Sequence, residues 1–153
     1  MAKTALNIVR ESLQAYADRG VFRGFHESGK GQFSFTWFYH YPLQLTVDVT
    51  KHQLKFAQLL PGVPAKAPLY AELKRFVQER HDATLPEHRR VERKLALVTC
   101  ANQRGHVSLS LKVKNNEYAY GISKLVNLVH ELFVHLREAH PEYLVENFDV
   151  PQE

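Results

Sequence analysis

The longest periodic pattern of apolar residues predicts a helix over residues 121–140, GISKLVNLVHELFVHLREAH. Its apolar side chains are spaced three and four residues apart, which places them on one face of a helix. They are Ile122, Leu125, Val126, Val129, Leu132, Phe133 and Leu136. Pro141 ends the pattern, because proline disrupts the interior of a helix. We expect this face to pack against the strands that the preceding chain predicts.

Two shorter patterns predict helices at residues 4–19 and 68–79. In the first, Thr4 is a candidate N-cap and Gly20 a candidate helix stop. Its apolar stripe consists of Leu6, Val9, Leu13 and Tyr16. In the second, Pro68 is favourable because proline fits the first turn of a helix. Its apolar face consists of Leu69, Leu73, Phe76 and Val77.

Alternation of apolar and polar residues predicts strands in the remaining chain. They cover residues 21–27, 33–41, 43–50, 54–60, 93–101 and 106–113. The strand at 33–41 is the most aromatic, with one side formed by Phe33, Phe35, Trp37, Tyr39 and Tyr41. The strand at 93–101 is apolar on both faces, which favours a central position in the sheet.

The order of these elements predicts an α+β protein with one antiparallel sheet of about five to six strands packed against helices. The order is α-β-β-β-β-α-β-β-α, and residues 1–153 form a single domain. Residues 141–153 are an acidic tail that either docks through Leu144, Val145 and Phe148 or frays. The sheet face turned away from the helices is rich in Ser, Thr and Gln, and is either solvated or meets a second copy. Phe38 and His40 stand out on that face as candidate binding residues.

The number of cysteines and the lengths of the apolar runs limit the classes to which the protein can belong. The single cysteine, Cys100, excludes an intrachain disulfide and a four-cysteine zinc site. Charges at Lys3, Arg10 and Glu11 interrupt any apolar core of a signal peptide. No apolar run approaches the ~20 residues that cross a bilayer. We therefore expect a cytoplasmic protein with no membrane partner.

The net charge of +4 is unevenly distributed. From Glu131 onward there are six acidic residues and one basic residue, which leaves 19 basic and 10 acidic residues before it, a net charge of +9. This asymmetry indicates an anionic partner, an acidic end that folds back on the basic body, or an unevenly charged solvated surface. Nucleic acid is not expected as a partner, because the chain lacks a dense basic stripe.

Several sequences resemble chemical motifs without meeting their requirements. In HELFVH, His130 and His135 are five residues apart, roughly 140° around a helix, so they cannot share a metal ion. GFHESGKG at 24–31 has Gly31 where a phosphate-binding loop needs Ser or Thr, and predicts a hairpin turn instead. Nine scattered histidines form no tight ligand cluster, although convergence of distant ones such as His26 and His106 is left open. We expect no metal, no other cofactor and no catalytic residues, with Cys100 structural.

The densest charge cluster is PEHRRVERK, residues 86–94. Arg89, Arg90 and Arg93 are candidate binding residues for a phosphate or a carboxylate, because guanidinium groups pair with both bidentately. Trp37 or Tyr39 would supply aromatic walls to such a site. The alternative is that these arginines pair with neighbouring glutamates or with the acidic tail.

The order of elements is similar to that of type III secretion chaperones, with one strand more. This resemblance implies a small, dimeric cytosolic module that binds another protein's chain. Our first hypothesis is therefore a non-enzymatic, chaperone-like or adaptor protein that forms a homodimer. The alternatives are a small-ligand or anion-binding protein that uses Arg89, Arg90 and Arg93, and a weak nucleic-acid binder.

Overall fold

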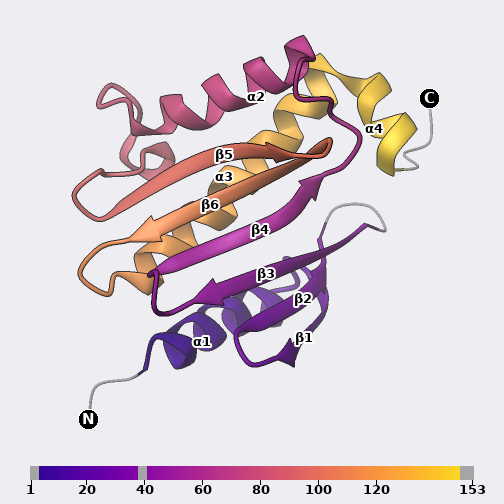
Figure 1. Ribbon diagram of the computed structural model, residues 1–153. Coiled ribbons are helices and arrows are strands. Elements are labelled where there is room, and N and C mark those ends of the chain that lie inside the picture. Colours follow the sequence, from indigo (N-terminus) through magenta and orange to yellow (C-terminus); the bar gives the residue numbers. More distant parts are fainter. Residues whose placement is uncertain (1–3, 38–40, 149–153) are drawn as a thin grey trace.

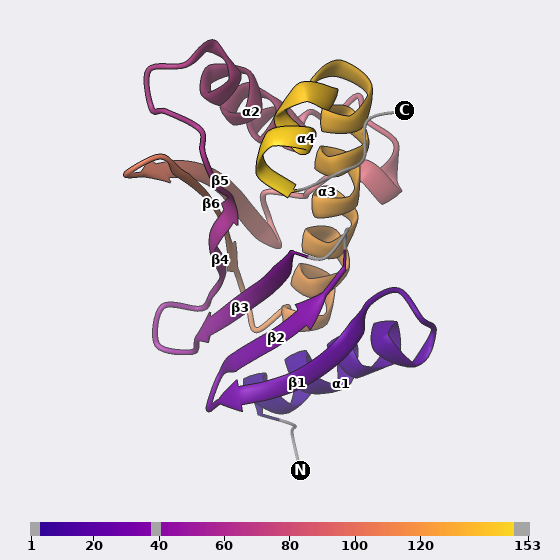
Figure 2. The same ribbon diagram turned by 90° about the vertical axis from the view of Figure 1, so that its right-hand side faces the viewer.

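The computed structural model describes residues 4–37 and 41–148, which form one six-stranded antiparallel sheet with the helices on one of its faces (Figures 1 and 2). The elements are α1 (Ala5–Asp18), β1 (Arg23–Gly29), β2 (Gln32–Thr36), β3 (Pro42–Asp48), β4 (Gln53–Leu60), α2 (Pro68–Gln78), the 3-10 helices η1 (Glu79–His81) and η2 (Glu87–Arg89), β5 (Ala96–Gln103), β6 (His106–Val113), α3 (Tyr118–Ala139) and α4 (Pro141–Phe148). The predicted α+β class and the order of its elements are confirmed, and α4 is added at the end.

Local chemistry explains where the first helix begins and ends. The Thr4 side chain caps α1 by accepting a hydrogen bond from the Asn7 amide at 3.2 Å. Gly20 follows the helix with φ of +79°, a conformation that glycine adopts without strain. The predicted cap and the predicted stop of this helix are both confirmed.

The long helix α3 begins at Tyr118, three residues before the predicted start. Gly121 therefore lies inside the helix, where it permits a close approach to the sheet. A Cβ atom at Gly121 would lie 2.6 Å from Val113 Cγ1 and 3.1 Å from Leu111 Cδ2. The absence of a side chain at this position lets α3 pack directly on β6.

The strand order in the sheet is β1-β2-β3-β4-β6-β5, and all neighbours are antiparallel. β5 is therefore an edge strand, and its predicted central position is wrong. On one face of β5, Val98 and Cys100 are buried because α2 covers them and Val77 of that helix lies beside them, whereas Leu97 on the other face is only partly buried. Apolar residues in a strand can thus result from a helix that packs on the strand, as well as from a central position in the sheet.

The predicted alternation in the first half of the sheet is confirmed where the structure describes it. Phe33 and Phe35 are buried on the helix side, while Gln44 is exposed on the opposite, polar side. The turn between β1 and β2 confirms the predicted hairpin, since Gly29 pairs with Gln32 and Gly31 has φ of +76°. Phe38, Tyr39 and His40 lie outside the described residues, so the predictions for these positions remain predictions.

The C-terminal segment docks on the helix side rather than fraying, as far as Phe148. Tyr143, Leu144 and Phe148 of α4 are buried. The Phe148 ring lies 5.4 Å from that of Phe133 and 4.7 Å from that of Tyr41. α4 therefore packs against α3 (Figure 2) and against Tyr41, the residue just before β3.

None of the helices within residues 4–37 and 41–148 combines the length and the apolar character that crossing a bilayer requires.

Candidate functional site

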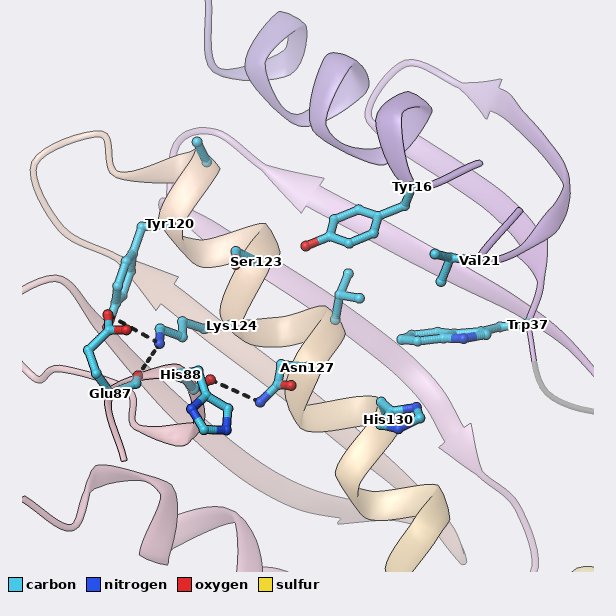
Figure 3. Close-up of a pocket in the computed structure, with 12 residues that line it drawn as sticks. Tyr16, Val21, Trp37, Glu87, His88, Tyr120, Ser123, Lys124, Asn127 and His130 are labelled. Carbon is cyan, nitrogen blue, oxygen red and sulfur yellow. Dashed lines mark hydrogen bonds and ion pairs between the residues drawn. The ribbon is translucent and has the colours of Figure 1, made fainter. Parts of the chain in front are cut away.

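A hollow lined by aromatic and polar side chains lies between α1 and α3, and we call it the α1–α3 groove (Figure 3). Its volume is about 980 Å³. Its walls are contributed by α1, the turn before β1, the residue after β2, η2 and α3. The lining residues are Tyr16, Val21, Trp37, Glu87, His88, Ala119, Tyr120, Ser123, Lys124, Val126, Asn127 and His130.

Aromatic rings from separate elements form the apolar part of this groove. Trp37 and Tyr16 are both partly buried against the core. The Trp37 ring meets the buried ring of Phe22 edge-on at 5.8 Å, and the Tyr16 ring lies 6.3 Å from it. Arg19 places its guanidinium 4.6 Å from the Tyr16 ring, close enough for a cation–π contact. The rings are thus held in place by the core while one part of each faces the groove.

Val126 shows why the sequence did not predict this groove. It belongs to the apolar stripe of the long helix, yet it is only partly buried and lines the groove. Leu128, which the predicted stripe omitted, is buried instead. The apolar stripe of α3 is therefore wider than the part of the helix that the sheet covers. In the sequence, this width is the feature that indicates a second surface of contact on the helix.

The polar wall of the groove is centred on Lys124, whose side chain is only 7% exposed. Its ammonium group donates a hydrogen bond to the Glu87 carbonyl oxygen at 2.5 Å and lies 3.8 Å from the Glu87 carboxylate. It also lies 5.4 Å from the Tyr120 ring. Asn127 donates to the His88 carbonyl oxygen at 3.1 Å, which fixes η2 to α3 at a second point (Figure 3). Charge-pattern analysis of the sequence did not single out Lys124, because its neighbour Glu87 is distant along the chain.

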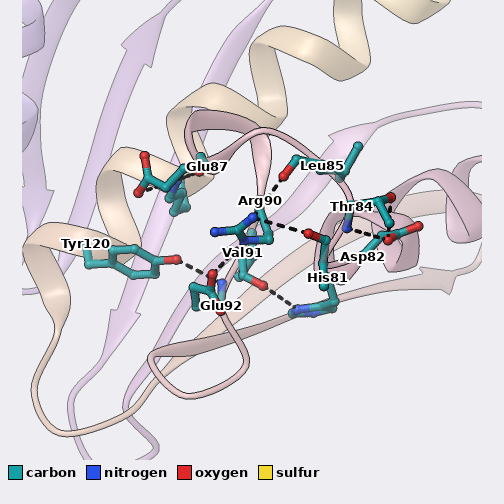
Figure 4. A network of polar contacts seen from close by, with 11 residues as sticks. His81, Asp82, Thr84, Leu85, Glu87, Arg90, Val91, Glu92 and Tyr120 are labelled. Carbon is teal, nitrogen blue, oxygen red and sulfur yellow. Dashed lines mark hydrogen bonds and ion pairs between the residues drawn. The ribbon is translucent and has the colours of Figure 1, made fainter.

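Tyr120 links this wall to the loop that carries the arginine cluster. Its hydroxyl oxygen accepts a hydrogen bond from the Glu92 amide at 2.9 Å (Figure 4). Burial raises the pKa of the Tyr120 hydroxyl above its ordinary value. The hydroxyl is therefore neutral at physiological pH and serves to hold the loop.

The three arginines predicted as a binding cluster do not point to a common site. Arg89 pairs with Glu131 of α3 at 3.3 Å. Arg90 pairs with Glu92 at 2.6 Å and also donates to the carbonyl oxygens of Ala83 and Leu85 (Figure 4). Arg93 is exposed. Two of the three guanidinium groups thus stabilise the loop between α2 and β5.

The same loop is fixed at its other end by His81. Its Nδ1 atom lies 3.0 Å from the Val91 carbonyl oxygen (Figure 4). Its Nε2 atom accepts a hydrogen bond from the Val98 amide at 3.1 Å. Because Nε2 is an acceptor, the proton of the neutral ring is on Nδ1, which donates to Val91. His81 therefore ties the loop to β5.

The other histidines divide into separated and converging groups. His26 lies on β1 and His106 on β6, with three strands between them, so this pair does not converge. His130 lines the α1–α3 groove, whereas His135 on the same helix contacts Glu72 of α2. His140, at the end of α3, contacts the same carboxylate. Glu72, His135 and His140 offer three potential metal ligands whose ligand atoms lie within 4.8 Å of one another.

Cys100 has the properties of a structural cysteine. Its side chain is buried beneath α2, and burial raises the pKa of the thiol to about 11. A thiol with this pKa is protonated at neutral pH, whereas catalytic cysteines react as thiolates. Its geometry thus agrees with the structural role that the sequence predicts.

The comparisons with known proteins add no relative: no family model matches the chain, and neither the curated proteins nor the solved structures contain a match.

Proposed function

We propose that the protein is a non-enzymatic, chaperone-like binding module that holds a segment of another polypeptide in the α1–α3 groove. The observation that carries this proposal is the convergence of Tyr16, Trp37 and Tyr120 on one hollow of about 980 Å³. Partly exposed aromatic rings on a rigid frame are the usual anchors of protein–protein contacts. The frame here is the helix layer and the sheet beneath it.

The charge around the groove favours an acidic segment as its occupant. Lys124 and Glu87 line the hollow as an ion pair, so the positive charge that an occupant meets comes from Arg19, whose guanidinium lies over the Tyr16 ring at the edge of the groove. Glu87 is the one acidic residue among the lining residues. An acidic peptide that carries an apolar or aromatic side chain would therefore match both the charge and the aromatic walls.

The hydrogen bonds of Lys124 and Tyr120 in the wall of the groove support binding rather than catalysis. Lys124 is engaged by the Glu87 carbonyl oxygen, and the Tyr120 hydroxyl accepts the Glu92 amide proton. Both contacts hold the wall of the groove together. A general acid or base would instead need a proton that it can exchange with a substrate.

The resemblance in the order of elements to type III secretion chaperones adds two features to this proposal. The protein would act in the cytoplasm, and it would form a homodimer. Multi-angle light scattering of the purified protein measures the mass directly against the 17.7 kDa of one chain. A mass of one chain at micromolar concentration would remove the homodimer from the proposal without affecting the groove.

The groove itself can be tested with the single tryptophan of the chain, since Trp37 lies in its wall. A photo-crosslinking amino acid at Ser123, which is exposed in the groove, captures an occupant in the host cell. The captured segment is identified by mass spectrometry, synthesised, and titrated while Trp37 emission is recorded. We expect a saturable change of emission that weakens at higher salt, because the attraction is partly electrostatic.

A matched pair of variants gives the control. Val126→Asp places a carboxylate inside the groove and should weaken binding of an acidic segment by at least tenfold, about 1.4 kcal/mol. Gln44→Asp places the same charge on the opposite face of the sheet and should leave binding unchanged. Equal binding by the two variants would remove the groove as the binding site.

A small anionic ligand is the second candidate, and one observation favours it. A neighbouring hollow of about 440 Å³ is lined by Arg89, His88 and His130 together with Glu131 and Glu138, so an anion would bind there by displacing Glu131 from Arg89. A thermal-shift screen with nucleotides and phosphorylated metabolites tests this candidate. A rise of more than about 2 °C that Arg89→Met abolishes would support it.

A further inference from the structure

Three side chains from two helices and a helix end meet at one point, on the side of α3 that faces α2. Glu72 lies on α2, His135 on α3, and His140 immediately after α3. The Nε2 atoms of His135 and His140 lie 2.7 Å and 2.6 Å from the same oxygen, Oε2, of Glu72. The two imidazole nitrogens are thus directed at a single point in space.

The end of α3 explains how two histidines five residues apart converge. In a continuous helix their side chains would point roughly 140° apart. α3 ends at Ala139, however, and His140 leaves the helical conformation with φ of −138° and ψ of 56°. This change of backbone direction brings the His140 ring back to the side on which His135 lies, with the ring centroids 5.8 Å apart.

Neighbouring residues hold this arrangement in place. The Phe76 ring, one turn after Glu72 on α2, stacks on the His135 ring at 5.1 Å with an interplanar angle of 28°. The His140 amide donates to the Leu136 carbonyl oxygen at 2.8 Å, which fixes the end of α3. The position of the His135 ring and the backbone at His140 are therefore set by contacts that do not involve the carboxylate.

We propose that Glu72, His135 and His140 bind a divalent transition metal ion of the Zn²⁺ class. Two imidazole nitrogens and one carboxylate are a ligand set that Zn²⁺ accepts at metal–ligand distances of about 2.0–2.2 Å. Imidazole ligands suit zinc and its transition-metal neighbours, whereas Mg²⁺ and Ca²⁺ prefer an all-oxygen site.

The distances fit this ion after a small movement. Tetrahedral coordination at these bond lengths places ligand atoms about 3.3 Å apart. The nitrogen–oxygen distances in the structure are 2.7 Å and 2.6 Å, so the ligand atoms must separate by roughly half an ångström. The side chains are 28%, 29% and 38% exposed for His135, His140 and Glu72, which leaves them room for this movement.

The partial exposure also determines what kind of site this is. Three protein ligands leave the fourth position of a tetrahedral ion to water or to a group from outside. The ion would join α2 to the junction of α3 and α4, elements that are distant in sequence. We infer a metal clamp that stabilises the helix layer and presents one open coordination position to the solvent. This inference is independent of the proposed function, since the ligands do not line the α1–α3 groove.

Metal titration of the chelator-treated protein tests the site. We expect one Zn²⁺ per chain by competition with a chromophoric chelator, and four-coordinate visible absorption when Co²⁺ is used as the probe. Saturating Zn²⁺ should raise the melting temperature by about 5–10 °C at about a hundredfold excess over the dissociation constant. His135→Gln and His140→Gln should each weaken binding by at least the roughly 10- to 100-fold that loss of an outer-shell partner costs.

His130→Gln is the matched control, because it removes an exposed imidazole from the same helix without touching the three ligands. It should bind Zn²⁺ as the wild type does. Circular dichroism of each metal-free variant establishes that it is folded before titration. Equal Zn²⁺ binding by the wild type and the folded double variant His135→Gln/His140→Gln overturns the proposal, as does loss of binding in His130→Gln alone.

Discussion

Arg80 and Glu131 form an ion pair below the surface, with 2.5 Å between a guanidinium nitrogen and a carboxylate oxygen. Their side chains are only 6% and 14% exposed. The Glu131 carboxylate also accepts hydrogen bonds from Arg89 at 3.3 Å and from Asn127 at 2.8 Å. Glu131 is the first residue of the acidic C-terminal part of the chain, so this contact joins the acidic end to the basic body that precedes it.

We expect Glu131→Gln to destabilise the protein strongly. The substitution leaves the buried Arg80 guanidinium without its counter-charge, and breaking a buried pair in this way costs about 3–5 kcal/mol. Urea unfolding followed by circular dichroism measures the loss. Because Arg80 also lies over the Phe76 ring at 4.2 Å, part of its environment remains and the fold should persist.

An exposed pair of the same residue types provides the comparison. Arg10 and Glu27 lie 2.8 Å apart with side chains 41% and 27% exposed. Glu27→Gln should destabilise the protein far less than Glu131→Gln does, because solvent screens such a pair. Equal losses for the two variants would show that burial of the Arg80–Glu131 pair has no energetic consequence.

Gly121→Ala tests the close approach of α3 to the sheet. Alanine favours a helix over glycine by about 1 kcal/mol, so an exposed glycine would be improved by the change. Here the new methyl group would lie 2.6 Å from Val113 Cγ1 and 3.2 Å from Leu54 Cδ1. We expect a net destabilisation of about 1–3 kcal/mol from overpacking. Ser123→Ala, at an exposed position of α3, should be neutral or slightly stabilising in the same unfolding measurement.

Periodicity predicted the elements well because it follows from burial on one face. It correctly placed the sheet, its antiparallel class and the three main helices. It misplaced the start of α3 at Gly121. A glycine that permits close packing inside a helix cannot be told from a glycine at a helix end by its residue type alone. It placed β5 in the centre of the sheet, because a covering helix and a neighbouring strand both demand apolar residues.

The candidate sites depend on contacts that sequence spacing cannot contain. The rule for histidine spacing assumes a continuous helix, and it is correct for His130 and His135. His135 and His140 converge because the helix ends between them and because α2 supplies Glu72 from a distant part of the chain. The α1–α3 groove likewise joins Tyr16, Trp37 and Tyr120, whose proximity follows from the packing of α1 on α3.

Cys100 should react slowly with thiol reagents. Burial raises its pKa to about 11, against about 8.5 for a free cysteine. At about pH 8 the fraction of thiolate is then smaller by about a hundredfold or more, and labelling by a disulfide reagent should be slower by at least that factor. The unfolded protein in denaturant is the control, and comparable labelling of the native protein would contradict the burial of this thiol.

The same shift has a consequence for stability at alkaline pH. A thiol whose pKa is higher in the folded state than in the unfolded state favours folding below the unfolded pKa. This contribution is lost as the pH rises from about 8.5 towards 11. Cys100→Ser should remove that part of the pH dependence, which unfolding curves recorded across this range will measure.

Docking of α4 predicts a large effect at its last described residue. Phe148 is 5% exposed and its ring lies 5.4 Å from that of Phe133. Phe148→Ala should lower the free energy of unfolding by about 3–5 kcal/mol, because it removes a buried ring and leaves a cavity. Glu146→Ala, at an exposed position of the same helix, should change it by no more than about 0.5 kcal/mol. If the acidic end frayed instead, the two substitutions would have equally small effects, since neither side chain would contribute to the core.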